Sequence, residues 1–288
     1  MVSIHGFVMT DDMTGRTCLI TGGTSGIGKA TALALARMNA TVAFTARNVE
    51  KGKAVVDQIR SASESNTVDF LECDLSSLSS VRDCCTQFRE KYSGLHVLIN
   101  NAGTWEGGRK MSKDGIENTF AVNHLAPFLM TNLLVDLIKK SAPSRVISVT
   151  SGLHGGTIAF EDIEFKRRFR AMMAYRQSKL ADMLFIKELS RRIAGTGVTA
   201  NSLMPGFVAT GLSRNTTVVS RVFFRLFGSS PEKGAETSVY LASSPDVTNI
   251  SGECFRKKRI VKTSKESYDP ALAKRLWELS ESYTKKWL

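Results

Sequence analysis

A tyrosine and a lysine four residues apart, Tyr175 and Lys179, are the side chains in this sequence best suited to acid–base chemistry. They fall in a stretch of helical periodicity, residues 172–193, and residues four apart lie on the same face of a helix. A free tyrosine has a pKa of about 10, too high for proton transfer at neutral pH. A lysine ammonium stabilises the phenolate and brings that pKa toward the working range. The pair predicts a general acid–base centre.

Two further polar residues are candidates for the same centre. Ser151 follows a predicted strand at 145–150, where its hydroxyl could hydrogen-bond a substrate carbonyl oxygen and stabilise the charge that develops there. Thr150 is the neighbouring alternative, and a serine at this place could instead cap a turn. Asn123 lies inside a predicted helix over 117–140, where asparagine is intrinsically unfavourable; it is either an ordinary polar helix residue or a site residue, the role that the resemblance given below implies.

The sequence predicts that strands and helices alternate along the chain and position these residues. The predicted strands are rich in Val, Ile, Leu and Phe without polar alternation, which is typical of strands buried on both faces. They cover 17–21, 41–45, 67–72, 96–100, 145–150 and 198–203, and the predicted helices cover 26–38, 49–61, 76–91, 117–140 and 172–193. This alternation predicts an α/β fold, a Rossmann-type doubly wound parallel sheet with helices on both faces. Since no linker divides the chain, we expect a single domain over 1–288.

Two longer connections, 157–171 and 205–230, depart from this rhythm. Each leaves the predicted carboxyl edge of the sheet, where ligands bind in open α/β folds, so both are predicted substrate loops. Their apolar candidates for lining the substrate site are Phe160, Phe207, Phe223, Phe224 and Phe227. They favour a lipophilic aldehyde, ketone or alcohol as the substrate.

A glycine-rich loop joins the first predicted strand to the first helix, in the order Thr-Gly-Gly-Thr-Ser-Gly-Ile-Gly from 21 to 28. Gly22 would permit the tight turn, Gly26 the approach of a pyrophosphate, and Gly28 close packing of helix on sheet. The helix N-terminus would present unpaired N–H groups to the anion. The predicted cofactor contacts in this loop are Gly22, Thr24, Ser25, Gly26, Ile27 and Gly28. No Lys-Ser/Thr pair follows, so an ATP-binding P-loop is not indicated.

The residues after the second strand distinguish between the two nicotinamide cofactors. Binding of the 2′-hydroxyl of NAD usually needs an acidic residue here, whereas the 2′-phosphate of NADP needs a cation. The strand ends in Ala46-Arg47-Asn48 with no carboxylate, and Lys51 and Lys53 follow. Arg47, with Lys29 near it, could bind the extra phosphate, which favours NADP(H) over NAD(H).

The chain has 288 residues and a formal net charge of +12, and no run of 18 or more apolar residues. A membrane-spanning helix or a signal peptide is therefore not expected. The five cysteines form no CxxC pair, which argues against disulfides and metal and favours a reducing, cytoplasmic compartment. The basic clusters at 166–170 and 256–259 come without a nucleic-acid-binding motif, so no nucleic-acid partner is expected. Residues 220–227 pair aromatics with arginines, which indicates either peripheral membrane contact or a helix that packs over the substrate site or between subunits.

Several of these motifs occur in the order found in the short-chain dehydrogenases/reductases, and the chain resembles that family over nearly its whole length. The motifs are the loop at 21–28, Asp74, Asn100-Asn101-Ala102-Gly103, Asn123, Ser151, Tyr175 with Lys179, and Pro205-Gly206 with Thr210. The stretches 114–125, 141–151 and 175–181 resemble the retinol-dehydrogenase-like branch in particular.

The resemblance implies a role for each matching residue. Asn123 would hold a water that links the catalytic lysine to solvent, and Lys179 would also hold the nicotinamide ribose. Asp74 would contact the adenine end, while Asn101 and Gly103 would line the cofactor cleft. Thr210, after Pro205, would approach the nicotinamide amide. The family often forms dimers or tetramers through two long helices, here 117–140 and 172–193.

We therefore expect an NADP(H)-dependent oxidoreductase, a carbonyl reductase or retinol-dehydrogenase-like enzyme, with Asn123, Ser151, Tyr175 and Lys179 as catalytic residues. It would interconvert a lipophilic carbonyl and its alcohol, with the direction left open. The alternative is a non-catalytic NADP(H)-binding scaffold or redox sensor on the same fold. The intact set of four residues argues against that alternative.

Overall fold

A parallel sheet forms the centre of the protein. The computed structural model describes residues 12–206 and 230–288, and in them eight strands lie in the order β3-β2-β1-β4-β5-β6-β7-β8. They are β1 (Thr17–Ile20), β2 (Thr41–Ala46), β3 (Val68–Glu72), β4 (Val97–Asn100), β5 (Ser144–Val149), β6 (Val198–Leu203), β7 (Cys254–Arg256) and β8 (Arg259–Ile260). Only β8 runs antiparallel to its neighbour within this described sheet. The predicted doubly wound α/β fold is confirmed.

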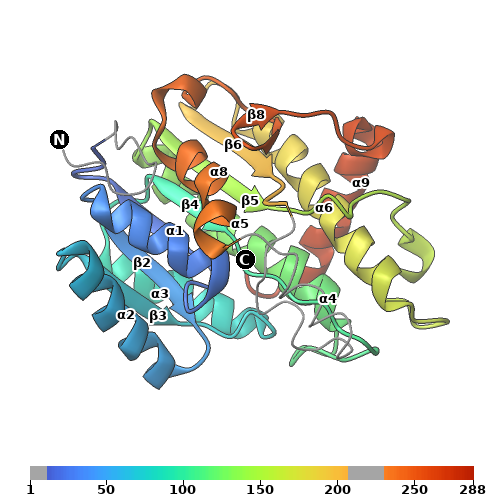
Figure 1. Ribbon diagram of the computed structural model, residues 1–288. Helices are drawn as coiled ribbons and strands as arrows, with labels where there is room; N and C mark the ends of the chain where they lie inside the picture. Colours follow the sequence, from blue (N-terminus) through green and yellow to red (C-terminus); the bar gives the residue numbers. More distant parts are fainter. Residues whose placement is uncertain (1–11, 207–229) are drawn as a thin grey trace.

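Helices cover both faces of the sheet (Figure 1). One layer contains α1 (Gly26–Arg37), α2 (Val49–Ser63) and α8 (Pro231–Ser243), and the other contains α3 (Leu78–Lys91), α5 (Ala126–Lys140) and α6 (Ala171–Arg192). Alternate residues of a strand point to opposite faces, so Cys18 and Ile20 of β1 join one hydrophobic core while Leu19 joins the other. This burial on both faces explains why the strands carry no polar alternation.

The helical stretch predicted over 117–140 contains a local widening. It consists of α4 (Asn118–Phe120), one π-helical turn at Ala121–Leu125, and α5. Within the described residues it is the one helical run long and apolar enough to cross a membrane, but 67% of its most apolar window is buried inside the protein. The run is therefore accounted for as a core helix.

The helix α9 (Pro270–Thr284) packs against α6 on the outer side of that layer (Figure 1). The Trp277 ring meets the Phe128 ring of α5 edge-on at 4.8 Å and stacks on Phe185 of α6 at 5.8 Å. Trp277 thus joins α9 to both α5 and α6.

Residues of the segment 157–171 contact both α6 and α9. The side chain of Gln177 on α6 accepts a hydrogen bond from the N–H of Ala159 at 2.9 Å and donates one to the carbonyl oxygen of Ile163 at 2.9 Å. Arg275 of α9 stacks over the Phe160 ring at 4.0 Å. Phe160 packs against the core and is not among the described residues that line the cavity presented below. The predicted role of 157–171 as a substrate loop stays a prediction.

Candidate active site

A cavity of about 710 Å³ opens where the carboxyl ends of β1 and β4 diverge. This is the place where the strand order reverses, and ligands of open α/β sheets bind there. The cavity brings together fourteen of the residues predicted from the sequence: Gly22, Thr24, Ser25, Gly26, Ile27, Gly28, Arg47, Asp74, Asn101, Gly103, Ser151, Tyr175, Lys179 and Pro205. Thr210, Phe207, Phe223, Phe224 and Phe227 lie outside the described residues.

The glycine loop is shaped by close backbone packing. Gly22 has φ of +70°, a conformation that side chains with a Cβ rarely adopt. A Cβ on Gly28 would lie 2.5 Å from both the Asn101 side-chain nitrogen and the Gly22 carbonyl oxygen. Ser25, the N-cap of α1, makes no capping hydrogen bond with its side chain. The first turn of α1 therefore presents N–H groups that no cap side chain satisfies, as an anion site requires.

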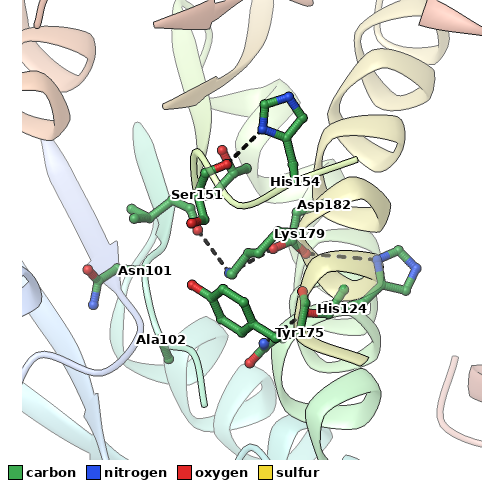
Figure 2. Close-up of polar contacts among 12 residues, drawn as sticks. Asn101, Ala102, His124, Ser151, His154, Tyr175, Lys179 and Asp182 are labelled. Carbon is green, nitrogen blue, oxygen red and sulfur yellow. Dashed lines mark hydrogen bonds and ion pairs between the residues drawn. The ribbon is translucent and has the colours of Figure 1, made fainter. Parts of the chain in front are cut away.

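The loops after β1 and β4 are joined by hydrogen bonds. The Thr21 hydroxyl accepts from the N–H groups of Asn101 and Ala102 at 2.9 and 3.0 Å. The Asn101 amide donates to the Thr21 carbonyl oxygen at 2.8 Å. Asn101 thus holds the cleft wall in place as well as lining it (Figure 2).

Basic residues line the cavity near the carboxyl end of β2. Arg47 and Lys51 both line it, whereas Lys29 binds Gln58 on α2 and does not line the cavity. Asp74 accepts from the N–H and hydroxyl of Ser76 and pairs with Lys113 at 3.0 Å. Burial alone would raise the pKa of Asp74, but these hydrogen bonds and the Lys113 charge outweigh it and hold the pKa below its usual value.

Ser151 and Thr150 have different environments at the end of β5. The Thr150 hydroxyl donates to the carbonyl oxygen of Leu203 on β6 at 2.9 Å, so its proton is already used. The Ser151 hydroxyl oxygen accepts from the N–H of Leu153 at 3.0 Å, which is the turn contact that serine often makes. A hydroxyl that accepts one bond still carries a proton to donate. The geometry favours Ser151 over Thr150 as a donor to a ligand in the cavity.

Asn123 lies behind the cavity wall rather than in it. It occupies the π-helical turn, a feature often found near functional sites. Its side chain accepts from the Thr104 N–H at 2.7 Å and donates to the Thr104 carbonyl oxygen at 3.0 Å and to the Ser178 hydroxyl at 2.9 Å. Asn123 therefore connects the loop after β4 to α6, the helix that carries Tyr175 and Lys179.

Tyr175 and Lys179 project from one side of α6, and Ser151 faces them from the end of β5 (Figure 2). The ring of Trp105 stacks on the Tyr175 ring, with centroids 5.1 Å apart. Trp105 also lines the cavity, as does Arg256 at the end of β7, and sequence reasoning identified neither as a site residue. For Trp105, the signal was an aromatic residue directly after the Asn100–Thr104 stretch.

Lys179 is buried and held by two oxygen atoms. Its ammonium donates to the Val149 carbonyl oxygen at 3.2 Å and to Asp182 Oδ2 at 2.9 Å (Figure 2). Burial opposes the charged form, but the charges of Asp182 and Tyr175 outweigh it, so the pKa of Lys179 is raised above its usual value. The lysine therefore remains an ammonium ion at neutral pH.

The cysteines are buried, and one of them, Cys73, lines the cavity. All five are buried free thiols, and burial raises the pKa of Cys18 to about 12. No cluster of His, Cys, Asp and Glu that could hold a metal occurs in residues 12–206 and 230–288.

Comparison with known proteins identifies the family. The short chain dehydrogenase family model matches residues 16–218, well over half of the chain. The chain belongs to the short-chain dehydrogenases. It is 41% identical to retinol dehydrogenase 14 of Mus musculus over 93% of this chain and 86% of that protein. It is 40% identical to retinol dehydrogenase 13 of Homo sapiens, over 91% of this chain and 82% of that protein.

A solved structure shares the same architecture. A protein from Mycobacterium Paratuberculosis is 33% identical, with a TM-score of 0.78 and coverage of 97% of this chain and 98% of that chain. Together with the retinol dehydrogenase relatives, the family membership makes this short-chain dehydrogenase an oxidoreductase that interconverts carbonyls and alcohols with a nicotinamide cofactor.

Proposed function

We propose that this protein is an NADP(H)-dependent oxidoreductase that interconverts a lipophilic aldehyde or ketone and its alcohol, with Tyr175 as the acid–base group. The observation that carries the proposal is the single cavity lined by the glycine loop, Arg47, Ser151, Tyr175 and Lys179. A cofactor-binding end and an acid–base end thus share one space. The cofactor, when bound, supplies or accepts the hydride.

The residues present fit NADP(H). The uncapped first turn of α1 and the close packing at Gly28 suit a pyrophosphate. Arg47 would bind the 2′-phosphate, because its guanidinium offers several donors in one plane and neither Arg47 nor Asn48, the two residues directly after β2, is an acid that could bind a 2′-hydroxyl instead. Asp74 would lie by the adenine, and Asn101, Gly103 and Pro205 along the cleft, with Thr210 near the nicotinamide.

The acid–base steps follow from the positions of three side chains. In carbonyl reduction the Tyr175 hydroxyl donates its proton to the substrate oxygen while Ser151 donates a hydrogen bond to the same atom. The Lys179 ammonium stabilises the phenolate that remains. Asn123 acts behind them as the anchor of the proton path to solvent. Alcohol oxidation uses the same groups in reverse.

The substrate class rests on the names of the relatives and on the cavity wall. Retinol, the substrate in both relatives' names, is a lipophilic alcohol. The wall near Tyr175 includes the apolar side chains of Trp105, Val149, Leu153 and Met204. A cytoplasmic enzyme that works at or near a membrane surface would meet such substrates, and the exposed basic run Arg256–Arg259 would suit anionic lipid.

The test is turnover of NADPH with a panel of lipophilic aldehydes and ketones, monitored by the loss of nicotinamide absorbance. We expect turnover with at least one of these carbonyls and a faster rate with NADPH than with NADH. Tight binding of NADPH without turnover of any carbonyl or alcohol would instead support the non-catalytic scaffold.

A further inference from the structure

We propose that Asp182 is a positioning residue that holds the Lys179 ammonium and thereby sets the pH at which Tyr175 gives up and regains its proton. This proposal rests on the proposed function, in which Tyr175 is the acid–base group. It concerns an acidic side chain that touches neither the cavity nor the reacting atoms.

The position of the lysine is fixed by two of its three N–H donors. Asp182 takes one at 2.9 Å and the Val149 carbonyl oxygen takes another at 3.2 Å. Both side chains of the pair are 5% exposed, so water cannot replace these partners freely. One donor is left for the cavity, which Lys179 also lines. Asp182 thus determines where the remaining N–H of Lys179 points.

Asp182 also balances the charge of the lysine. With the carboxylate present, Tyr175, Lys179 and Asp182 together carry no net charge while the phenol is protonated. Loss of the phenol proton then leaves a buried negative charge. Without the Asp182 carboxylate, the three side chains would carry one positive charge while the phenol is protonated. Loss of the phenol proton would then leave them neutral. Asp182 therefore favours the phenol over the phenolate, and the phenol is the form that donates a proton during carbonyl reduction.

No other charge among the described residues takes over this role. His124, from the π-helical turn, has its Nδ1 4.0 Å from Asp182 Oδ1, and its Nε2 pairs with the Ser280 hydroxyl of α9 at 2.8 Å. Burial, with a contribution from the Lys179 charge, lowers the pKa of His124 to about 3. The histidine is therefore neutral at working pH. Val149 of β5 offers only its carbonyl oxygen, so Lys179 and His124 are the titratable groups that face Asp182.

Asp182 itself can change its charge within a mild pH range. Burial raises its pKa to about 6, against the opposing effect of Lys179. At lower pH the carboxylate takes up a proton and the lysine charge is no longer balanced. The ion pair thus places a titratable group outside the cavity in contact with the lysine that would stabilise the Tyr175 phenolate.

The direct test follows the ionisation of Tyr175 in the full chain, without any substrate. Tyrosinate absorbance is titrated in the wild type, Asp182→Asn, Asp182→Glu and Tyr175→Phe, and the Tyr175 component is obtained by subtracting the Tyr175→Phe curve. Asp182→Asn keeps the shape and removes the charge, and we expect the Tyr175 midpoint to move about one pH unit toward acid. Asp182→Glu restores the charge and should return the midpoint toward the wild-type value.

Glu188→Gln provides the matched control. Glu188 lies on the same helix, is 7% exposed and accepts from Arg192 at 2.8 Å, but does not contact Lys179. Its replacement removes an acidic partner of comparable burial and should leave the Tyr175 midpoint unchanged. If Asp182→Asn does not fold, Asp182→Ser, which leaves room for a water beside the ammonium, takes its place in the titration.

The pH profile of alcohol oxidation in the same proteins separates the two proposals. If Asp182→Asn leaves the Tyr175 midpoint of the absorbance titration unmoved, or if Glu188→Gln moves that midpoint equally, the role of Asp182 is overturned even if every protein is active. A shifted absorbance midpoint in proteins that turn over no substrate supports the role of Asp182 and contradicts the proposed enzymatic function.

Discussion

The ring of Trp105 is stacked on the ring of Tyr175, with centroids 5.1 Å apart and planes inclined by 17°. Trp105 lies on the loop after β4 and Tyr175 on α6, so the contact joins a loop and a helix that are separate in the chain. Aromatic stacking contributes about 0.5–1.5 kcal/mol beyond the area it buries. The contact restricts the orientation of the phenol on which the proposed chemistry depends.

We expect Trp105→Ala to lower kcat for carbonyl reduction by about three- to tenfold, because loss of roughly 1 kcal/mol of stacking frees the Tyr175 ring. Trp105→Phe keeps an aromatic partner and should retain most of the activity. Steady-state kinetics of the three proteins provide the comparison. Equal losses in both variants would show that stacking does not orient the phenol.

Gly28→Ala should damage cofactor binding through packing alone. The new methyl group would lie 2.5 Å from the Asn101 side chain and from the Gly22 carbonyl oxygen, so the glycine loop or the loop after β4 must shift. Overpacking of this kind costs about 1–3 kcal/mol. NADPH affinity by fluorescence titration should fall about tenfold or more. Gly108→Ala, with no atom within 4 Å of the added methyl group, is the control and should bind NADPH normally.

Arg47→Ala tests the choice between NADPH and NADH. A hydrogen bond to a charged group contributes about 1.5–3 kcal/mol, so the variant should lose NADPH affinity by roughly tenfold or more. NADH affinity should change little, because that cofactor lacks the 2′-phosphate. Lys53→Ala, which removes a neighbouring exposed cation paired with Glu50, is the control. An unchanged ratio of the two affinities in Arg47→Ala would remove Arg47 from the phosphate site.

His124 should make the protein less stable in acid. Its pKa is lowered by burial from 6.5 to about 3, so between these values the unfolded chain binds a proton that the folded chain does not. The free energy of unfolding therefore falls as the pH is lowered through this window, by about 1.4 kcal/mol per pH unit from this group. The raised pKa of Asp182, about 6, acts in the opposite sense and reduces the net slope.

Urea unfolding at pH 7, 6 and 5 in the wild type and His124→Gln isolates the histidine contribution, because Asp182 is present in both proteins. We expect the wild type to lose more of its stability on acidification than the variant. Parallel losses in the two proteins would mean that His124 takes up its proton in the folded state.

Much of the sheet could be predicted from the sequence because strands buried on both faces leave an unbroken apolar signature. The strands β1 to β6 begin and end within a residue or so of the predicted ranges. The three-residue β7 and the two-residue β8 are too short to leave such a pattern. The π-helical turn at Ala121–Leu125 was predicted as ordinary helix, since a single widened turn hardly changes the spacing of apolar residues.

The candidate site was predictable where short motifs carry it and not where distant contacts do. The glycine loop and the pair Tyr175 and Lys179 are local patterns, and the structure brings them to one cavity. Asp182 resembles an ordinary helix-surface acid three residues after a lysine, and only its tertiary surroundings, among them His124 of the π-helical turn, show it to be a buried partner. The helix α9 was not predicted, although Asp269 and Pro270 form a typical helix start.

The most direct test of the account is the rate of NADPH oxidation with a lipophilic aldehyde in the wild type and in Tyr175→Phe, with NADPH affinity measured in both. The variant loses only the phenolic hydroxyl. We expect kcat to fall by about 10²- to 10⁴-fold, the usual contribution of a general acid, while NADPH affinity stays within a few-fold. A Tyr175→Phe protein that reduces the aldehyde as fast as the wild type would contradict the account.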